Sequence, residues 1–141
     1  MTRRAHLRRL PTIADSARAF GPVDSALDQL SRGFIMADQN GTPMCVANGN
    51  PTPLAEALEG WALAWRRLLD HYRSDVDVSP LESLACALSG GDDIPQGLVS
   101  ECQSVVASLK RAFRKMNVYE VKSICNTVSI GILLEDKREA A

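Results

Sequence analysis

The sequence predicts a mainly α-helical protein, with a single domain of about five helices and a small β-hairpin between the first two helices. Three observations support this prediction. Apolar residues recur at alternating spacings of three and four, Gly and Pro divide the chain into segments, and an Asn-Gly pair lies between two apolar runs. With 141 residues, of which 45% are hydrophobic, the chain can bury one core of ordinary size. We therefore expect one helical domain at residues 20–141, preceded by a flexible basic arm at residues 1–19.

The predicted arm lacks a sustained apolar period and contains Pro11. Its charge is mainly basic and comes from Arg3, Arg4, Arg8, Arg9 and Arg18. A segment of this kind buries too little apolar surface to order itself. Phe20 is therefore expected to be the first anchored residue.

A short first helix is predicted from Pro22 to Ser31. Proline is favoured in the first helical turn, and Gly33 supplies a stop just after the end of the helix. One face of this helix is apolar and consists of Val23, Ala26, Leu27 and Leu30.

The hairpin is predicted from two apolar runs, residues 34–38 and 43–47, on either side of Asn40-Gly41. Asn-Gly between such runs is a strong signal for a two-residue hairpin turn. Residues 48–53 contain Asn, Gly and Pro and are expected to form a loop. Thr52-Pro53 then caps the next helix.

The clearest periodic pattern belongs to the second helix, which is predicted to end near Ser74. Its apolar stripe consists of Leu54, Leu58, Trp61, Trp65, Leu68 and Tyr72. Burial of two indoles and three leucines at roughly 25 cal/mol per Å² would stabilise a fold or a complex by several kcal/mol before entropy is subtracted. Trp61, Trp65 and Tyr72 are therefore expected to lie in the core or in a protein interface.

Two further helices follow this stripe. A capping box formed by Ser79 and Glu82 predicts the start of the third, and Gly90-Gly91 predicts its end. Pro95 opens the fourth, which is expected to pack on the tryptophan helix. Its apolar stripe consists of Leu98, Cys102, Val105, Leu109, Phe113 and Met116.

Asn117 is expected to cap a fifth helix, with Glu120 three residues later. The inward side of this helix is predicted to consist of Val121, Ile124, Cys125, Val128, Ile132 and Leu133. Residues 128–134 are also rich in β-branched side chains, so a strand there is an alternative.

The net charge of -1 conceals a segregation of charge along the chain. Basic residues concentrate in residues 1–22 and 110–122, whereas most acidic residues lie in residues 23–109. Two short basic islands therefore flank an acidic body. We take the islands as candidate sites for nucleic acid or for an acidic partner; their residues are Arg3, Arg4, Arg8, Arg9, Lys110, Arg111, Arg114 and Lys115.

Stability alone also explains part of this pattern, because cations at the end of a helix favour its macrodipole. A helix-turn-helix made of the third and fourth helices is disfavoured. The start of its recognition helix would carry Asp92, Asp93 and Glu101 against the bases.

The four cysteines are widely spaced and are expected to be reduced, with Cys86, Cys102 and Cys125 in helical patterns that suit small apolar residues. No Cys-x-x-Cys, His-x-x-x-His or His-x-Glu spacing is present. We therefore expect no cofactor and no metal. The alternative is a zinc site assembled from remote residues, namely Cys45, Cys86, Cys102, Cys125 and His71.

The sequence also contains few side chains in patterns suited to catalysis, and no enzymatic activity is expected. His6 and His71 are the only histidines, and a phosphate loop is absent. His71 beside Arg67 and Asp70 is a candidate base, although an exposed helix-surface histidine is the simpler interpretation.

The longest apolar run, residues 130–134, is far shorter than the roughly 20 residues that a membrane span requires. The basic start is not followed by an apolar segment of the kind found in secretory signals. The expected location is therefore the cytoplasm, with no membrane partner.

Three segments, residues 20–30, 57–61 and 122–128, resemble small proteins encoded by proteobacterial phages and prophages. Their sequences are FGPVDSALDQL, ALEGW and KSICNTV. The resemblance extends over most of the chain beyond the arm, and no activity is assigned to these proteins. It implies a mobile-element protein that acts by occupying a host or phage macromolecule.

The expected function is therefore non-catalytic: binding and modulation of a host or phage macromolecular complex, for example inhibition of a defence or transcription complex. The tryptophan helix and the acidic body are the expected protein-facing surfaces. The alternative is a nucleic-acid-binding transcriptional regulator that uses the two basic islands. A homodimer is compatible with either function.

Overall fold

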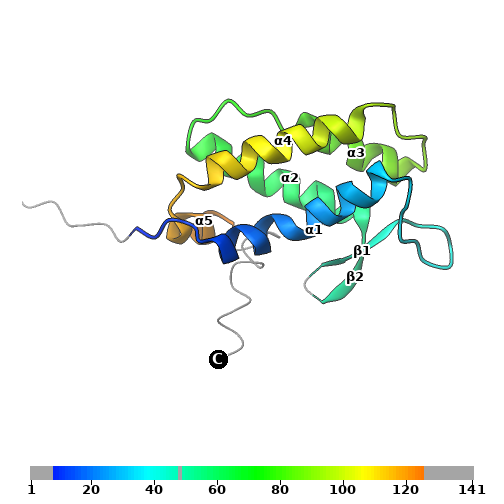
Figure 1. Cartoon of the computed structure of the whole chain (residues 1–141), viewed down its shortest axis with the longest axis horizontal. Helices are drawn as coiled ribbons and strands as arrows, with labels where there is room; N and C mark the ends of the chain where they lie inside the picture. The colour runs from blue at the N-terminus through cyan, green and yellow to red at the C-terminus, as the bar shows by residue number, and fades with distance from the viewer. Residues whose placement is uncertain (1–7, 48, 126–141) are drawn as a thin grey trace, which may run out of the picture.

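The computed structural model describes residues 8–47 and 49–125, and within them it contains five helices and an antiparallel hairpin between the first two, as the sequence predicts (Figure 1). Residues 128–134, for which the sequence allows either a helix or a strand, lie outside this part of the chain. The elements form one domain around one hydrophobic core. In chain order they are α1 (Ile13–Ser31), β1 (Met44–Ala47), β2 (Asn50–Pro53), α2 (Leu54–His71), α3 (Ser79–Gly90), α4 (Leu98–Phe113) and α5 (Val118–Ile124).

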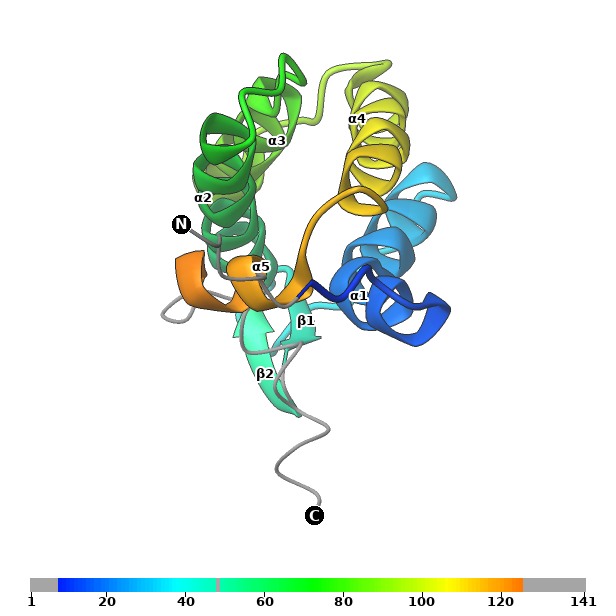
Figure 2. The ribbon, with the colours of Figure 1, turned by 90° about the vertical axis from the view of Figure 1, so that its left-hand side faces the viewer.

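The four long helices surround the core. In the end-on view of Figure 2, α2 and α3 lie on one side and α4 and α1 on the other, with α5 and the hairpin beneath them. The sequence predicts that α4 packs along α2, but in the structure α4 packs along α1 and α3. α2 and α4 are diagonal across the core and meet through their side chains, as shown by the rings of Trp65 and Phe113, whose centroids are 5.8 Å apart.

The first helix begins at Ile13, well before the predicted start at Pro22. The Thr12 hydroxyl accepts a hydrogen bond from the Asp15 N–H at 3.0 Å, and the Asp15 carboxylate accepts one from the Thr12 N–H at 2.9 Å. This reciprocal capping box satisfies two backbone donors that would otherwise lack partners at the start of the helix.

Pro22 therefore lies inside α1 and not in its first turn. It has no N–H to donate to the preceding turn, which weakens the helix locally. Burial of Phe20 and Val23 on either side offsets this cost. Residues 13–19 are thus helical and do not belong to a flexible arm, while residues 1–7 lie outside the described part of the chain.

The hairpin uses different strands from those expected. Residues 44–47, predicted as the second strand, form β1 and pair with β2, a segment predicted as a loop. A second Asn-Gly pair at positions 48 and 49 separates the strands, and Gly49 has a φ of +81°, which favours glycine. The first Asn-Gly pair is flanked by an isolated bridge between Ala37 and Pro43.

The two prolines of β2 explain how a segment rich in turn residues can form a strand. Pro51 and Pro53 alternate along β2, so their missing N–H groups both fall on the edge that faces away from β1. The pairs Cys45–Thr52 and Ala47–Asn50 therefore carry the ladder between the strands.

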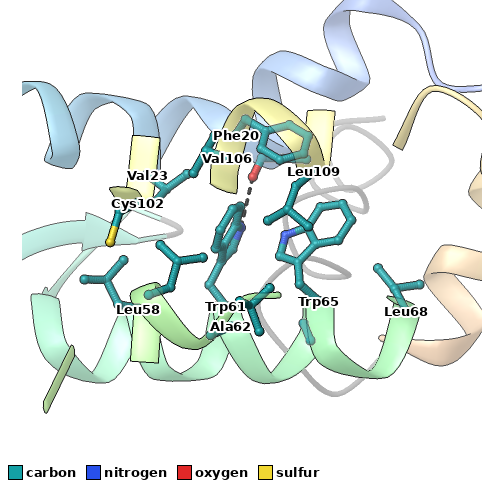
Figure 3. Close-up of a cluster of buried hydrophobic side chains, with 14 of the residues drawn as sticks. Phe20, Val23, Leu58, Trp61, Ala62, Trp65, Leu68, Cys102, Val106 and Leu109 are labelled. Carbon is teal, nitrogen blue, oxygen red and sulfur yellow. Dashed lines mark hydrogen bonds between the residues drawn. The ribbon is translucent and has the colours of Figure 1, made fainter. Parts of the chain in front are cut away.

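The tryptophan stripe of α2 forms the centre of the core (Figure 3). Trp65 is fully buried and Trp61 is 5% exposed. The ring of Phe20 from α1 stacks on Trp65 at 5.3 Å and meets Trp61 edge-on at 5.7 Å, and such aromatic pairs contribute beyond their buried area. The Trp61 indole N–H donates to the Ala19 carbonyl at 3.1 Å, which ties α2 to α1.

The ends of the later helices agree only in part with the sequence. The capping box predicted at Ser79 is absent, because Val78 is the N-cap and Glu82 pairs with Arg66 of α2. Asn117 does cap α5, where its side chain accepts from the Tyr119 N–H.

The caps and stripes of α2 and α4 also differ in detail. α2 has no side-chain hydrogen bond at its N-cap, which is Pro53, although a cap from Thr52-Pro53 was expected. On α4, Val106 is buried whereas Val105 is only partly buried. The periodicity thus identified the buried face with an error of one position.

Candidate functional site

The aromatic residues expected in the core or in an interface have structural roles. Trp61 and Trp65 lie in the core. The Tyr72 hydroxyl accepts from the Asn117 N–H at 3.1 Å and donates to the Glu120 carboxylate, and this joins α2 to α5. Burial and the hydrogen bond to Glu120 raise the pKa of Tyr72. The tryptophan stripe is therefore not available to a partner in this fold.

The described arginines of the first basic island are partly used within the fold. The Arg9 N–H donates to the Asn117 side chain at 3.2 Å, and the Arg9 carbonyl accepts from the Val118 N–H at 2.8 Å. The Arg9 guanidinium pairs with Asp15 at 2.7 Å. This residue therefore anchors the segment before α1 to the start of α5. Arg3 and Arg4 lie outside the described residues.

Asp15 is the centre of this anchor and is only 1% exposed. It pairs with Arg18 at 2.8 Å as well as with Arg9. Burial alone would raise the pKa of this carboxyl group, but the hydrogen bonds from Thr12 and Arg9 and the charge of Arg9 outweigh it and lower the pKa to about 2. The group is therefore a structural carboxylate that stays ionised.

The second basic island is also partly structural. Lys110 pairs with Asp24 of α1 at 2.6 Å and lies 5.9 Å from the centre of the Phe20 ring, which links α4 to α1. The Arg111 guanidinium donates to the Ser108 hydroxyl at 3.0 Å. These two cations of α4 thus have partners within the fold.

The two islands meet at one end of the molecule, because Arg9 contacts the residues that follow α4. Within the described part of the chain, Arg8, Arg114 and Lys115 are exposed and have no ion pair. A nucleic-acid surface at this end would therefore rely mainly on three cations.

The cysteines divide into three environments. Cys102 and Cys125 are fully buried, and burial raises their pKa values to about 12 and about 11. Cys45 is half-buried, and burial raises its pKa. Cys86 is exposed, although its helical pattern suggested a core position.

No group of three or more potential metal ligands occurs among the residues that the structure describes, so the remote zinc site is not assembled there. His71 is about half exposed and lies 3.9 Å from Glu120 across the gap between α2 and α5. Asp92 and Asp93 are both exposed after the end of α3.

We expect thiol labelling of the native protein to follow these environments. Cys86 should react fastest, Cys45 more slowly, and Cys102 and Cys125 slowest, because a buried thiol of high pKa is rarely present as the reactive thiolate. Mass spectrometry of the labelled protein over time would give the order. Rapid labelling of Cys125 without denaturant would contradict the packing of α5 on α2.

The sequence did not indicate the most distinctive surface of the molecule. Phe34, Ile35 and Met36 follow α1 and are 66%, 39% and 51% exposed, and Val46 of β1 is 55% exposed. We call these four residues the hairpin surface. The expected strand at residues 34–38 would have paired Phe34, Ile35 and Met36 with residues 43–47. In the structure Val46 pairs with Pro51 of β2 instead, and residues 34–38 contact the other edge of β1 through the hydrogen bond from the Met44 N–H to the Met36 carbonyl and the bridge between Ala37 and Pro43.

A groove of about 250 Å³ lies beside the hairpin surface, between α1 and β1. Its wall on α1 includes Pro22, Ala26 and Gln29, and Leu54 of α2 also lines it. Cys45 and Met44 of β1 complete the opposite wall together with residues of the hairpin surface. The groove is therefore lined largely by apolar side chains, as is usual for sites that hold a peptide or another apolar group.

Comparison of the chain with protein-family models, with curated proteins and with solved structures finds no match. Among the described residues, no helix is both long enough and apolar enough to cross a membrane. The hairpin surface, with its groove, is the candidate functional site.

Proposed function

We propose that this protein is a non-catalytic binding protein that modulates a macromolecular complex of a host or a phage, and that it contacts a protein of that complex through the hairpin surface. The observation that supports this proposal is the exposure of four large apolar side chains beside an apolar groove. Single exposed apolar residues are common, whereas a group of them at one place is typical of an interaction site.

The chemistry of the surface favours a protein partner. Phenylalanine and methionine are enriched at the centres of protein interfaces. Burial of apolar side chains such as Phe34 and Met36 stabilises a complex by roughly 25 cal/mol per Å² of area removed from water. The acidic body around the site would speed encounters with a basic partner surface through long-range attraction.

Affinity capture from the organism that encodes the chain tests this proposal. The intact protein should retain its partner after nuclease treatment, whereas Phe34→Ser combined with Met36→Ser should lose it, because most of the apolar contact is removed. Leu63→Ser is a matched control, since Leu63 is 44% exposed on α2, away from the hairpin. Equal capture by the wild type and the double variant would contradict the proposal.

The meeting of the two basic islands at one end supports a second candidate, a nucleic-acid-binding regulator. The cations available for phosphate contacts there are Arg8, Arg114 and Lys115. With three such contacts, the logarithm of the binding constant would fall with the logarithm of the salt concentration with a slope of about three at most, which is typical of weak, non-specific binding. A nucleic acid would also approach close to Glu120. Nuclease-sensitive capture that is lost in Arg114→Gln with Lys115→Gln would favour this alternative.

A further inference from the structure

A second hollow adjoins the hairpin surface. Its volume is about 540 Å³, and it lies between residues 40–43, the start of α2 and the end of α3. Pro43 and Pro53 form part of its wall, while the residues that follow them, Met44 and Leu54, line the groove beside the hairpin surface. The two hollows therefore lie on either side of the same two chain segments, at the end of the molecule where α1 finishes and α2 begins (Figure 1).

The charged groups of this second hollow are carboxylates. Glu56 and Glu59 of α2 line it, and none of the described residues in its wall is a lysine or an arginine. Asp92 lies at the rim, because one of its carboxylate oxygens is 2.9 Å from the position that a β-carbon on Gly90 would occupy. The end of α3 adds the negative end of a helix dipole. We call this hollow the acidic pocket.

These carboxylates are not used to hold the fold together. Within residues 8–47 and 49–125, Glu56, Glu59 and Asp92 form no ion pair. Glu56 lies in the first turn of α2, where a negative charge favours the helix dipole, but Glu59 lies beyond that turn. Stability of the helix therefore explains the first of these charges and leaves the other two free for a cationic ligand.

The arrangement of the carboxylates favours an organic cation over a metal ion. A metal ion requires ligands that converge on one point, and no such group of three occurs in the described part of the chain. The guanidinium group of arginine and the ammonium group of lysine instead present several N–H donors, which carboxylates on different walls can accept. The pocket is therefore suited to a basic side chain.

The segment between the hairpin surface and the acidic pocket is held in place by the fold itself. The Met44 N–H donates to the Met36 carbonyl at 2.7 Å. The Asp38 carboxylate accepts from the N–H groups of Asn40 and Thr42 at 2.9 and 3.0 Å, which orders the loop that forms one wall of the pocket. A surface that is ordered before binding loses less entropy when a partner binds.

We propose that the hairpin surface and the acidic pocket together bind one segment of a partner protein. Apolar side chains of that segment contact Phe34 and Met36, and a neighbouring arginine or lysine side chain enters the pocket. This inference rests on the proposed function and specifies the chemistry of the partner. Charge complementarity supports it, because apolar contacts that exclude water strengthen the attraction between the basic side chain and the carboxylates.

Selection of random short peptides against the full-length protein tests this inference. Peptides that also bind the Phe34→Ser, Met36→Ser double variant are discarded, so that every retained peptide requires the hairpin surface. We expect the retained sequences to be enriched in arginine or lysine within a few residues of phenylalanine, leucine, isoleucine or methionine. Retained peptides without such enrichment would overturn the inference but leave the hairpin surface as a binding site.

The affinity of one retained peptide for two charge variants then locates the basic side chain. Glu56→Gln with Glu59→Gln should weaken binding roughly tenfold, mainly through faster dissociation, because charge-assisted hydrogen bonds of the bound state are lost. Asp70→Asn with Asp75→Asn is the matched control, since it removes two exposed negative charges at and beyond the other end of α2. It should leave the dissociation rate unchanged.

The remaining outcomes separate this inference from the proposed function. Equal weakening in the two charge variants would show only long-range attraction to the acidic body and would overturn the role of the pocket. Unchanged affinity in the Glu56→Gln, Glu59→Gln variant would overturn it as well, while the hairpin surface would stand. If no peptide requires Phe34 and Met36, both the inference and the hairpin surface as the site of the proposed function fail.

Discussion

Trp65→Ala is expected to lower the free energy of unfolding by about 3–5 kcal/mol, the range measured for large aromatic truncations in cores. Trp65 is fully buried and contacts Phe20 and Phe113, so its removal leaves a cavity between three helices. Chemical denaturation followed by circular dichroism would measure the change.

The neighbouring residue Leu63 provides the control for this substitution. It lies on the same helix but is 44% exposed, so Leu63→Ala should change the unfolding free energy by about 0.5 kcal/mol or less. Similar losses for the two variants would show that the tryptophan stripe is not the centre of the core.

Asp15→Asn is expected to destabilise the protein by about 2–3 kcal/mol, because the buried carboxylate holds Arg9, Arg18 and the first turn of α1 together. Its effect should depend on pH. The pKa of Asp15 is about 2 in the folded chain, below the ordinary value of 3.8, so the unfolded chain binds the proton more tightly.

The stabilisation by this carboxylate is therefore fully present above the ordinary pKa and is lost as the pH falls from about 4 to about 2. A pKa difference of this size corresponds to about 2 kcal/mol. Denaturation of the wild type and of Asp15→Asn across this range should show the two unfolding free energies converging at low pH. A constant difference would contradict the role given to the charge.

The helices could be predicted because their signals are local. In α2, the spacing of Leu58, Trp61, Trp65 and Leu68 defines one face without reference to the rest of the chain. The start of α1 was missed although its capping box was visible in the sequence, because Pro22 gave a competing signal for a later start. The hairpin was predicted at the first Asn-Gly pair, at positions 40 and 41, whereas the observed strands meet at the second pair, at positions 48 and 49.

The candidate site depends on contacts between distant parts of the chain, which the sequence does not display. The pairing of Arg9 with the start of α5, and of Lys110 with Asp24, removes two cations from the predicted basic surface. Phe34 and Met36 are exposed because residues 44–47 pair with β2 and do not pair with residues 34–38 as a full strand. A shift of one residue in strand register moves every side chain of the strand to the other face, so the choice of turn decides which side chains are exposed.

The affinity of the isolated partner for three forms of the full-length protein tests the central claim most directly. We expect Phe34→Ser with Met36→Ser to weaken binding by roughly tenfold or more, since loss of about 1.4 kcal/mol of apolar contact suffices for that factor. Arg114→Gln with Lys115→Gln should bind like the wild type. Full affinity in the hairpin variant together with loss of binding in the basic variant would contradict the account and place the functional surface at the basic end.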